Sequence, residues 1–375
     1  MKFRSERDGL LDALVTAGRA GAARMGMGFG TQSLRLAVRG SELEVTGSDP
    51  DLVIEVVQVV SGEQDGTVLI PSRLATEIIR SFDPGTVSVE GNDQEARITS
   101  GRAEFVIRVP VGAEITRLIP AESKGIALPA GPFAEGLRQV VPAALNDDSR
   151  APQLTGVLMV AVDKGLRLVA TDSYRLAFRD LEGMSALEAG SEVLVPARAL
   201  AEIQRLVGGE GERERQTELV FRHTEVDAVF EVHGVRLTTR LLKGPFPDYQ
   251  RLLPASYPNA FRVAREEFAA AVRRVRLMVR DAKDAATPVR ISFETDGAEL
   301  TVLTAESGRA AERVDGQFTG GELVVAFNPN YLLDGIEAIR AETVILEVID
   351  SSKPATVRGE GEDDYRYLLM PVRVS

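Results

Sequence analysis

Three segments of the chain share one pattern of apolar and polar positions. Residues 3–14, 126–137 and 261–272 each begin with an apolar residue and carry further apolar residues seven and eleven positions later. A small residue, such as Ala13 in the first segment, stands immediately before the last of these. Apolar positions three or four residues apart lie on one face of a helix. Each segment is therefore predicted to be a short strand that runs into an amphipathic helix.

An apolar run that reaches a proline forms a second landmark in each repeat. These runs are residues 68–71, 193–196 and 324–329. The helical stretches that follow them are residues 74–82, 199–207 and 330–340. Proline suits the first turn of a helix because its ring supplies the helical φ and no amide donor is needed there. The pattern predicts a buried strand followed directly by a helix.

Strand-like sequence closes each repeat and completes an α+β unit. The closing segments are residues 97–109, 229–242 and 365–374. Apolar and polar residues alternate between the landmarks, as at residues 34–38 and 42–45, which is typical of sheets with one buried face. Clusters of Gly, Asp and Asn predict hairpin turns at residues 91–93, 162–165 and 295–297.

The repeats predict three similar domains, each with two helices backed by antiparallel sheets. Their expected limits are residues 1–122, 123–253 and 254–375, because polar or Pro-bearing segments near these limits separate the repeats. Loose self-similarity occurs in any α+β chain, but landmarks that recur in the same order favour a true repeat.

The amino-acid composition indicates what kind of hydrophobic core the protein has and in which cell compartment it is expected. Hydrophobic residues make up 44% of the 375 residues, aromatic residues make up 5%, and tryptophan is absent, so we expect aliphatic cores. The absence of cysteine excludes disulfides and thiolate metal sites. The charged segment 1–8 differs from a signal peptide, and no run approaches the ~20 apolar residues of a membrane helix. We therefore expect a cytoplasmic protein.

The sequence lacks the residues of a catalytic or metal site. Its two histidines, His223 and His233, have no acidic or cysteine partner at metal-ligand spacing. There is no Gly-x-Ser-x-Gly turn and no Walker-type phosphate loop. The paired acids at residues 147–148 and 363–364 are typical of solvated turns. An unrecognised enzyme is a remote alternative, and we expect no catalytic residue, cofactor or metal.

Arginine is concentrated on the predicted helices although the formal net charge is −12. A negative chain argues against nucleic-acid binding, but net charge does not say where the charges lie. If the helices faced one surface, that surface would be positive; alternatively, each arginine forms a local ion pair in solvent. The basic residues on or beside predicted helices are Arg19, Arg24, Arg73, Arg80, Arg138, Arg198, Arg205, Arg273, Arg274, Arg276, Arg280, Lys283 and Arg340.

Several motifs are similar to those of a known family. Residues 168–177 read Leu-Val-Ala-Thr-Asp-Ser-Tyr-Arg-Leu-Ala, and residues 365–374 read Tyr-Arg-Tyr-Leu-Leu-Met-Pro-Val-Arg-Val. Residues 244–249, Gly-Pro-Phe-Pro-Asp-Tyr, lie between them, and residues 71–73 read Pro-Ser-Arg. Over its full length the chain resembles the bacterial DNA polymerase III beta subunit, the DNA sliding clamp. The resemblance is strongest to members from high-GC Gram-positive bacteria (actinobacteria).

The resemblance implies a non-catalytic processivity factor with the DNA clamp fold. Two chains would form a head-to-tail homodimer ring, with helices facing the hole and sheets at the rim. Loose, sequence-independent phosphate contacts would let the ring slide on double-stranded DNA. The clamp loader and the replicative and repair DNA polymerases would dock through short extended peptides in one groove per chain.

The resemblance also assigns residues to three sites. Arg24 and Arg73 match family residues that touch DNA, and the helical pattern adds Arg80, Arg138, Arg198, Arg205, Arg273 and Arg276. The partner-peptide groove is expected to contain Leu154, Thr171, Ser173, Tyr174, Arg175, Leu176, Pro247, Arg251, Leu252, Asn328, Tyr331, Pro354, Leu368, Met370, Pro371 and Arg373. The dimer interface is expected to contain Phe105, Leu277 and Met278.

Two segments depart from the family pattern. Residues 24–30 replace its usual Leu-Pro-(Val/Ile)-Leu segment, and residues 150–154 are one residue longer than usual. A diverged clamp paralogue would show such departures, either as an interaction scaffold that no longer encircles DNA or as the clamp of a specialised polymerase. Arginine on every predicted helix favours the DNA clamp over the scaffold.

Overall fold

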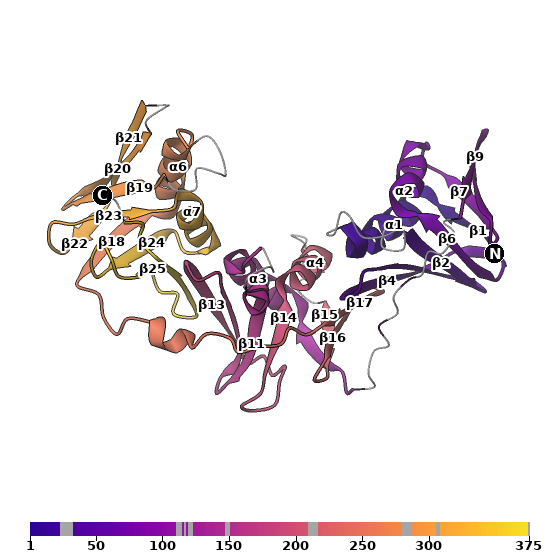
Figure 1. Cartoon of the computed structure of the whole chain (residues 1–375), viewed down its shortest axis with the longest axis horizontal. Coiled ribbons are helices and arrows are strands. Elements are labelled where there is room, and N and C mark those ends of the chain that lie inside the picture. The colour runs from indigo at the N-terminus through magenta and orange to yellow at the C-terminus, as the bar shows by residue number, and fades with distance from the viewer. Residues whose placement is uncertain are drawn as a thin grey trace. The chain divides into compact units, whose positions relative to one another are not determined.

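The structure is a computed structural model that describes residues 1–22, 33–109, 115, 118, 123–146, 151–208, 217–279, 287–304 and 308–373. The chain, drawn in Figure 1, divides into two compact units. The first unit joins Met1–Ala130 to Gly209–Leu241, and the second joins Gly131–Gly208 to Leu242–Ser375. Each unit therefore includes part of the predicted middle domain.

The first unit contains two antiparallel sheets. The five-stranded sheet has the order β5-β1-β7-β8-β9, with β1 Lys2–Glu6, β5 Ser61–Gln64, β7 Thr86–Gly91, β8 Glu95–Ser100 and β9 Ala103–Arg108. The eight-stranded sheet has the order β10-β15-β16-β17-β4-β3-β2-β6, with β2 Ser33–Arg39, β3 Glu42–Ser48, β4 Leu52–Val59, β6 Gly66–Pro71, β10 Ile126–Pro129, β15 Glu218–His223, β16 Asp227–Val232 and β17 Val235–Arg240. Because β17 pairs with β4, strands of the predicted first and middle domains share one sheet.

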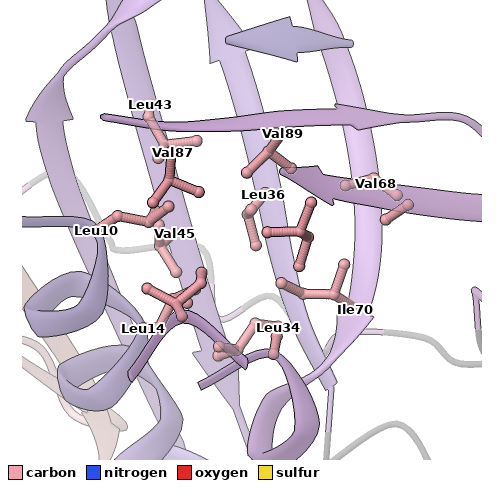
Figure 2. Close-up of a cluster of buried hydrophobic side chains, with 14 of the residues drawn as sticks. Leu10, Leu14, Leu34, Leu36, Leu43, Val45, Val68, Ile70, Val87 and Val89 are labelled. Carbon is pink, nitrogen blue, oxygen red and sulfur yellow. The ribbon is translucent and has the colours of Figure 1, made fainter. Parts of the chain in front are cut away.

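The core of the first unit is aliphatic, as its composition predicts. Helix α1 (Arg7–Ala22) packs against β3, β4 and helix α2 (Ser72–Ser81). Figure 2 shows that alternate residues of several strands point into one cluster with the apolar face of α1. The labelled side chains are Leu10, Leu14, Leu34, Leu36, Leu43, Val45, Val68, Ile70, Val87 and Val89. The alternation predicted at residues 42–45 is confirmed, whereas in residues 34–38 Ala37, on the other face of the strand, is buried as well.

A glycine allows α1 to approach the sheet closely. A Cβ atom on Gly47 of β3 would lie 1.9 Å from the carbonyl oxygen of Ala17 in α1. No real Cβ atom approaches backbone this closely, so a side chain at this position would push the helix away from the core.

The second unit contains a nine-stranded and a four-stranded antiparallel sheet. The larger has the order β14-β11-β12-β13-β26-β25-β24-β18-β22, with β11 Gly156–Val162, β12 Gly165–Thr171, β13 Arg175–Glu182, β14 Glu192–Pro196, β18 Asn259–Ala264, β22 Gln317–Thr319, β24 Thr343–Val348, β25 Ala355–Gly359 and β26 Tyr365–Leu369. The smaller has the order β21-β20-β19-β23, with β19 Val289–Glu294, β20 Gly297–Thr304, β21 Gly308–Asp315 and β23 Val324–Phe327. Pairing of β13 with β26 joins strands of the predicted middle and third domains.

The helices of the second unit pack on these sheets. They are α3 (Ala130–Val140), α4 (Ala197–Val207), α6 (Arg265–Arg276) and α7 (Pro329–Ala338), with 3-10 turns at Val141–Ala143, Pro152–Thr155 and Tyr249–Leu252. α4 contacts β14 and β11, α7 contacts β25 and β26, and α6 packs on α7 and on β18 to β21.

The predicted strand–proline–helix junctions are confirmed. Pro71 and Pro196 end strands immediately before α2 and α4, whereas Pro329 is the first residue of α7. Asn328 caps α7, because its side chain accepts hydrogen bonds from the backbone amides of Asn330 and Tyr331. The hairpin turns predicted near residues 91–93, 162–165 and 295–297 also lie between paired strands. Among the described residues, no helix is long and apolar enough to cross a membrane.

Candidate functional site

An apolar pocket of about 290 Å³ lies in the second unit, where several predicted groove residues meet. Its lining residues are Thr171, Ser173, Tyr174, Arg175, Leu176, Pro247, Leu252, Pro354, Leu368, Leu369 and Met370. They come from the β12–β13 turn, the segment before β18, the residue before β25, and the end of β26. The structure therefore brings together residues that are widely separated in the sequence.

The pocket rests on a buried apolar cluster of the nine-stranded sheet. The cluster consists of Leu158, Val169, Leu176, Phe178, Leu194, Tyr249 and Leu368. Leu242, Phe246 and Leu253 of the connecting segment pack against it, which holds Pro247 and Leu252 beside the pocket. The connecting segment is therefore a fixed wall and not a loose linker.

The turn between β12 and β13 forms a preorganised wall of the pocket. The Asp172 carboxylate accepts hydrogen bonds from the backbone amides of Tyr174 and Arg175, both at 2.9 Å. The Thr171 hydroxyl donates to the carbonyl oxygen of Arg175 at 2.7 Å. The backbone amide of Met370 donates to the Tyr174 carbonyl oxygen at 2.8 Å, which ties the end of β26 to the turn. Tyr174, within this turn, is 65% exposed.

Arg175 is buried and bonded within the protein, although the sequence suggests arginine and asparagine as binders of a peptide backbone or carboxylate. Its Nε donates to Asp172 at 2.9 Å, and its Nη1 donates to Asp334 of α7. Its guanidinium lies 4.2 Å from the centre of the Tyr331 ring. Burial raises the pKa of Asp334, and the hydrogen bond from Arg175 only partly opposes that shift.

Other predicted groove residues lie outside the lining of this pocket. Asn328 caps α7, and Tyr331 lies beneath the Arg175 guanidinium. Arg251 is exposed and pairs with Asp248 at 2.7 Å. Leu154 is buried, Pro371 is partly buried and Arg373 is exposed. Conversely, Leu369 lines the pocket but was not among the residues that the resemblance assigned to the groove.

The predicted DNA-contacting arginines of the first unit are exposed. Arg73 pairs with Glu77 at 2.9 Å, one helical turn away, and Arg80 lies in the last turn of α2. Arg24 lies outside the described residues, as do Arg280 and Lys283.

In the second unit most of the predicted arginines have partners within the protein. Arg138 binds Glu135 and donates to the backbone carbonyl oxygens of Glu337 and Ala338 at the end of α7. Arg205 pairs with Glu202, Arg273 with Glu337 at 2.8 Å, and Arg274 with Glu312. Arg276 donates to the Asn330 side chain at 3.0 Å, and Arg198 is partly buried. Local ion pairing, the alternative interpretation for single arginines, is thus frequent in this unit.

The predicted interface residues lie on an edge strand of the first unit and directly after α6 in the second unit. Phe105 is on β9, an edge strand of the five-stranded sheet, and is 39% exposed with its ring 5.8 Å from Phe82. Leu277 follows α6 and is 77% exposed, and Met278 is partly buried. Val106 of β9 and Leu303 of β20 are also exposed, and neither is among the predicted interface residues.

Two other hollows are lined mainly by polar and charged residues. One, of about 550 Å³, lies around Met1, Glu90 and Arg97 in the first unit; the other, of about 450 Å³, lies around Asp163, Asp180 and Asp363 in the second. Within the described ranges no group of three His, Cys, Asp or Glu residues could hold a metal ion.

Comparison with known proteins matches the three repeats to three domains of one family. The models of the N-terminal, central and C-terminal domains of the DNA polymerase III beta subunit match residues 1–118, 127–248 and 250–373. The chain belongs to the DNA polymerase III beta subunit family. The family that the sequence motifs indicate is therefore confirmed.

Curated relatives of the beta subunit family extend over the whole chain. The beta sliding clamp of Streptomyces coelicolor is 32% identical and covers 100% of both chains. That of Staphylococcus aureus is 28% identical and covers 100% of this chain and 99% of the relative. The actinobacterial relative agrees with the predicted resemblance to high-GC Gram-positive members, and both relatives support a DNA sliding clamp.

Solved beta subunit structures share the fold over the full length. The DNA polymerase sliding clamp of Bacillus subtilis superposes with a TM-score of 0.88 at 26% identity and covers 100% of both chains. The sliding clamp of Bartonella birtlesii, solved with griselimycin bound, has a TM-score of 0.90 at 25% identity and the same coverage. The α+β clamp fold with antiparallel sheets is therefore confirmed.

Proposed function

We propose that the chain forms a head-to-tail homodimeric ring that encircles duplex DNA without reading its sequence. The ring tethers the clamp loader and replicative and repair polymerases through short peptides, provides processivity without catalysis or a cofactor, and acts in the cytoplasm. The observation that carries this proposal is the match of the three beta subunit domain models to nearly the whole chain. We take the three domains to end near residues 122 and 253.

Two edge strands support closure of the ring by a second copy. β9 and β21 are two of the eight strands that lie at sheet edges in the part of the chain that the structure describes. Phe105 and Val106 are exposed on β9, and Leu303, which pairs opposite Arg309 of β21, is 73% exposed. An open edge with apolar side chains is a template for pairing with another chain. Pairing β9 of one copy with β21 of the other joins two different surfaces, which makes the contact head-to-tail.

The arginines support weak contact with phosphates. An exposed ion pair contributes only about 0–1 kcal/mol, so a phosphate can replace Glu77 at Arg73, or Glu337 at Arg273, at little cost. Such contacts release counterions and weaken as salt increases. Loose contact of this kind suits a protein that slides, since retention would come from encirclement.

The apolar pocket supports docking of a short peptide. Leu176, Leu252, Leu368 and Met370 line it, and the turn before Arg175 is held rigidly by Asp172. A concave, largely preformed apolar site suits two or three apolar side chains of an extended peptide. We take the remaining predicted groove residues to flank this pocket.

The test is retention on circular and on linear DNA. The chain is loaded onto a nicked plasmid by a matching clamp loader, half of the sample is linearised, and bound protein is separated by gel filtration. We expect retention on the circle and loss from the linear molecule, because the ring slides off free ends. Equal retention on both forms would contradict encirclement, and failure to load on either would favour the interaction scaffold.

A further inference from the structure

Helix α7 presents one polar face to the residues that form the pocket and to those of α6. Asn330, Asp334 and Glu337 are four and three positions apart, so they share this face. Asn330 accepts from Arg276, Glu337 pairs with Arg273, and Asp334 accepts from Arg175 of the pocket. Of these three contacts, the one that Asp334 makes joins α7 to a pocket residue, across a sequence separation of 159 residues.

α7 lies directly behind the strand that forms the floor of the pocket. A Cβ atom on Gly335 would lie 2.5 Å from the ring of Tyr367, so the helix touches this residue of β26 closely. The Tyr367 hydroxyl donates to the Tyr331 carbonyl oxygen at 2.8 Å. Tyr331 in turn supports the Arg175 guanidinium. The next residues after Tyr367, Leu368 to Met370, line the pocket.

The contact between Asp334 and Arg175 is the long-range ion pair of the turn that forms the pocket wall, and it adds to the hydrogen bond from the Met370 amide to the Tyr174 carbonyl oxygen. Asp172 binds Arg175 from within the same turn, three residues away, and moves with it. Asp334 belongs to a different element, helix α7. Its carboxylate accepts a hydrogen bond from Nη1 of Arg175, whose side chain is buried. A buried donor without a partner is costly, so losing Asp334 would drive Arg175 to rearrange and release the turn.

We propose that Asp334 is a positioning residue of the peptide groove, which acts through Arg175 to hold the turn of residues 172–174 in the conformation that accepts a peptide. This inference rests on the proposed peptide-binding function of the pocket. Asp334 itself is absent from the pocket lining, so it acts without touching the peptide.

The experiment measures peptide affinity for the full chain and for four variants. The probe is a fluorescein-labelled octapeptide with a polar first half and the ending Leu-Leu-Phe, followed by fluorescence polarisation. The variants are Asp334→Ala, Asp334→Asn, Glu337→Gln and Met370→Ala. Glu337 is the matched control, because it lies on the same face of α7 but pairs with Arg273 instead of Arg175.

We expect a graded loss of affinity. Asp334→Ala should weaken binding about tenfold, which corresponds to one charged hydrogen bond. Asp334→Asn keeps an oxygen acceptor for Arg175 but loses the charge, so it should weaken binding only about threefold. Glu337→Gln should leave the affinity unchanged.

A second readout separates positioning from general stability. The chain contains no tryptophan, so Tyr174→Trp places a single indole at the tip of the turn. In this background Asp334→Ala should lower the indole anisotropy under native conditions, and Glu337→Gln should not.

A folded Asp334→Ala variant with wild-type affinity and anisotropy would overturn the inference. If that variant does not fold, an Asp334→Asn variant with wild-type affinity would overturn it equally. These outcomes differ from failure of the groove itself, in which the wild-type chain would bind the probe no better than Met370→Ala.

Discussion

Ser173 occupies a backbone conformation that residues with a side chain rarely adopt. Its φ is +76°, and glycine is the residue that favours this region. The turn tolerates the strain because Asp172 accepts from two backbone amides and the Thr171 hydroxyl accepts from the Ser173 amide at 3.1 Å. Strained residues of this kind concentrate at binding sites. Here the strain presents Tyr174 to the solvent beside the pocket.

Ser173→Gly should raise the free energy of unfolding by about 1 kcal/mol, because glycine adopts positive φ without a Cβ penalty. Chemical denaturation of the full chain measures this change. Ser292→Gly is the control, since Ser292 lies within β19 of the same unit and is not at positive φ. At Ser292, glycine should lower the free energy of unfolding by roughly 0.5–1 kcal/mol. Destabilisation by both substitutions would show that the turn carries no strain.

At the scale of elements, a row of ion pairs crosses four neighbouring strands of the first unit. Arg222 of β15 pairs with Glu231 of β16 at 2.7 Å, and Glu231 pairs with Arg236 of β17 at 2.9 Å. Arg236 reaches Glu55 of β4 at 3.7 Å. The row crosses the β17–β4 pairing, where strands of the predicted first and middle domains meet. It therefore reinforces a junction that the repeats alone do not reveal.

Glu231→Gln should make the first unit less sensitive to acid. Burial acts to raise the pKa of Glu231, but hydrogen bonds from Arg222 and Arg236 outweigh it and lower the pKa below 4.5. Because the folded pKa is depressed, this stabilisation is complete above about pH 4.5 and is lost as the pH falls through the folded value.

Thermal midpoints between pH 3 and pH 7 would measure the acid sensitivity. The variant should be less stable than the wild-type chain at neutral pH, and the two should converge in acid. Glu225→Gln, in the exposed turn before β16, is the control and should follow the wild-type profile. Parallel profiles for Glu231→Gln and the wild-type chain would contradict the role of the ion pairs.

At the scale of the whole molecule, the two units differ in which surfaces they leave open. In the first unit the five-stranded sheet has an edge at β9, where Phe105 and Val106 are exposed. In the second unit the four-stranded sheet has an edge at β21, and Leu303, which pairs with this strand, is exposed, as is Leu277 after α6. Apolar side chains at an open edge need a partner to cover them. In a homodimer in which the β9 edge of each copy packs against the β21 edge of the other copy, the exposed apolar side chains of both edges are covered.

Phe105→Ala should shift the protein from dimer to monomer. We expect a mass near twice 40.5 kDa for the wild-type chain and a mass nearer 40.5 kDa for the variant by light scattering at micromolar concentration. Truncation of an aromatic interface residue weakens association by about 2 kcal/mol, roughly thirtyfold. Val59→Ala, at another exposed apolar residue of the first unit, should stay dimeric. A wild-type monomer would remove the basis of the ring.

Much of the fold could be predicted because its signals are local. The apolar spacing of residues 3–14, and the proline that precedes α2 or begins α7, depend only on nearby residues. The pairing of β4 with β17 and of β13 with β26 depends on strands far apart in the chain, and no periodicity reports it.

The sequence alone determined the family, the three repeats and most of the residues that meet at the pocket, because motifs and periodicity are properties of short segments. Only the tertiary structure decided what the charged side chains bind. It pairs Arg138 with the end of α7, Arg273 with Glu337, and Arg175 with Asp334. A guanidinium takes whichever acceptors folding brings within reach, and those acceptors lie up to 200 residues away.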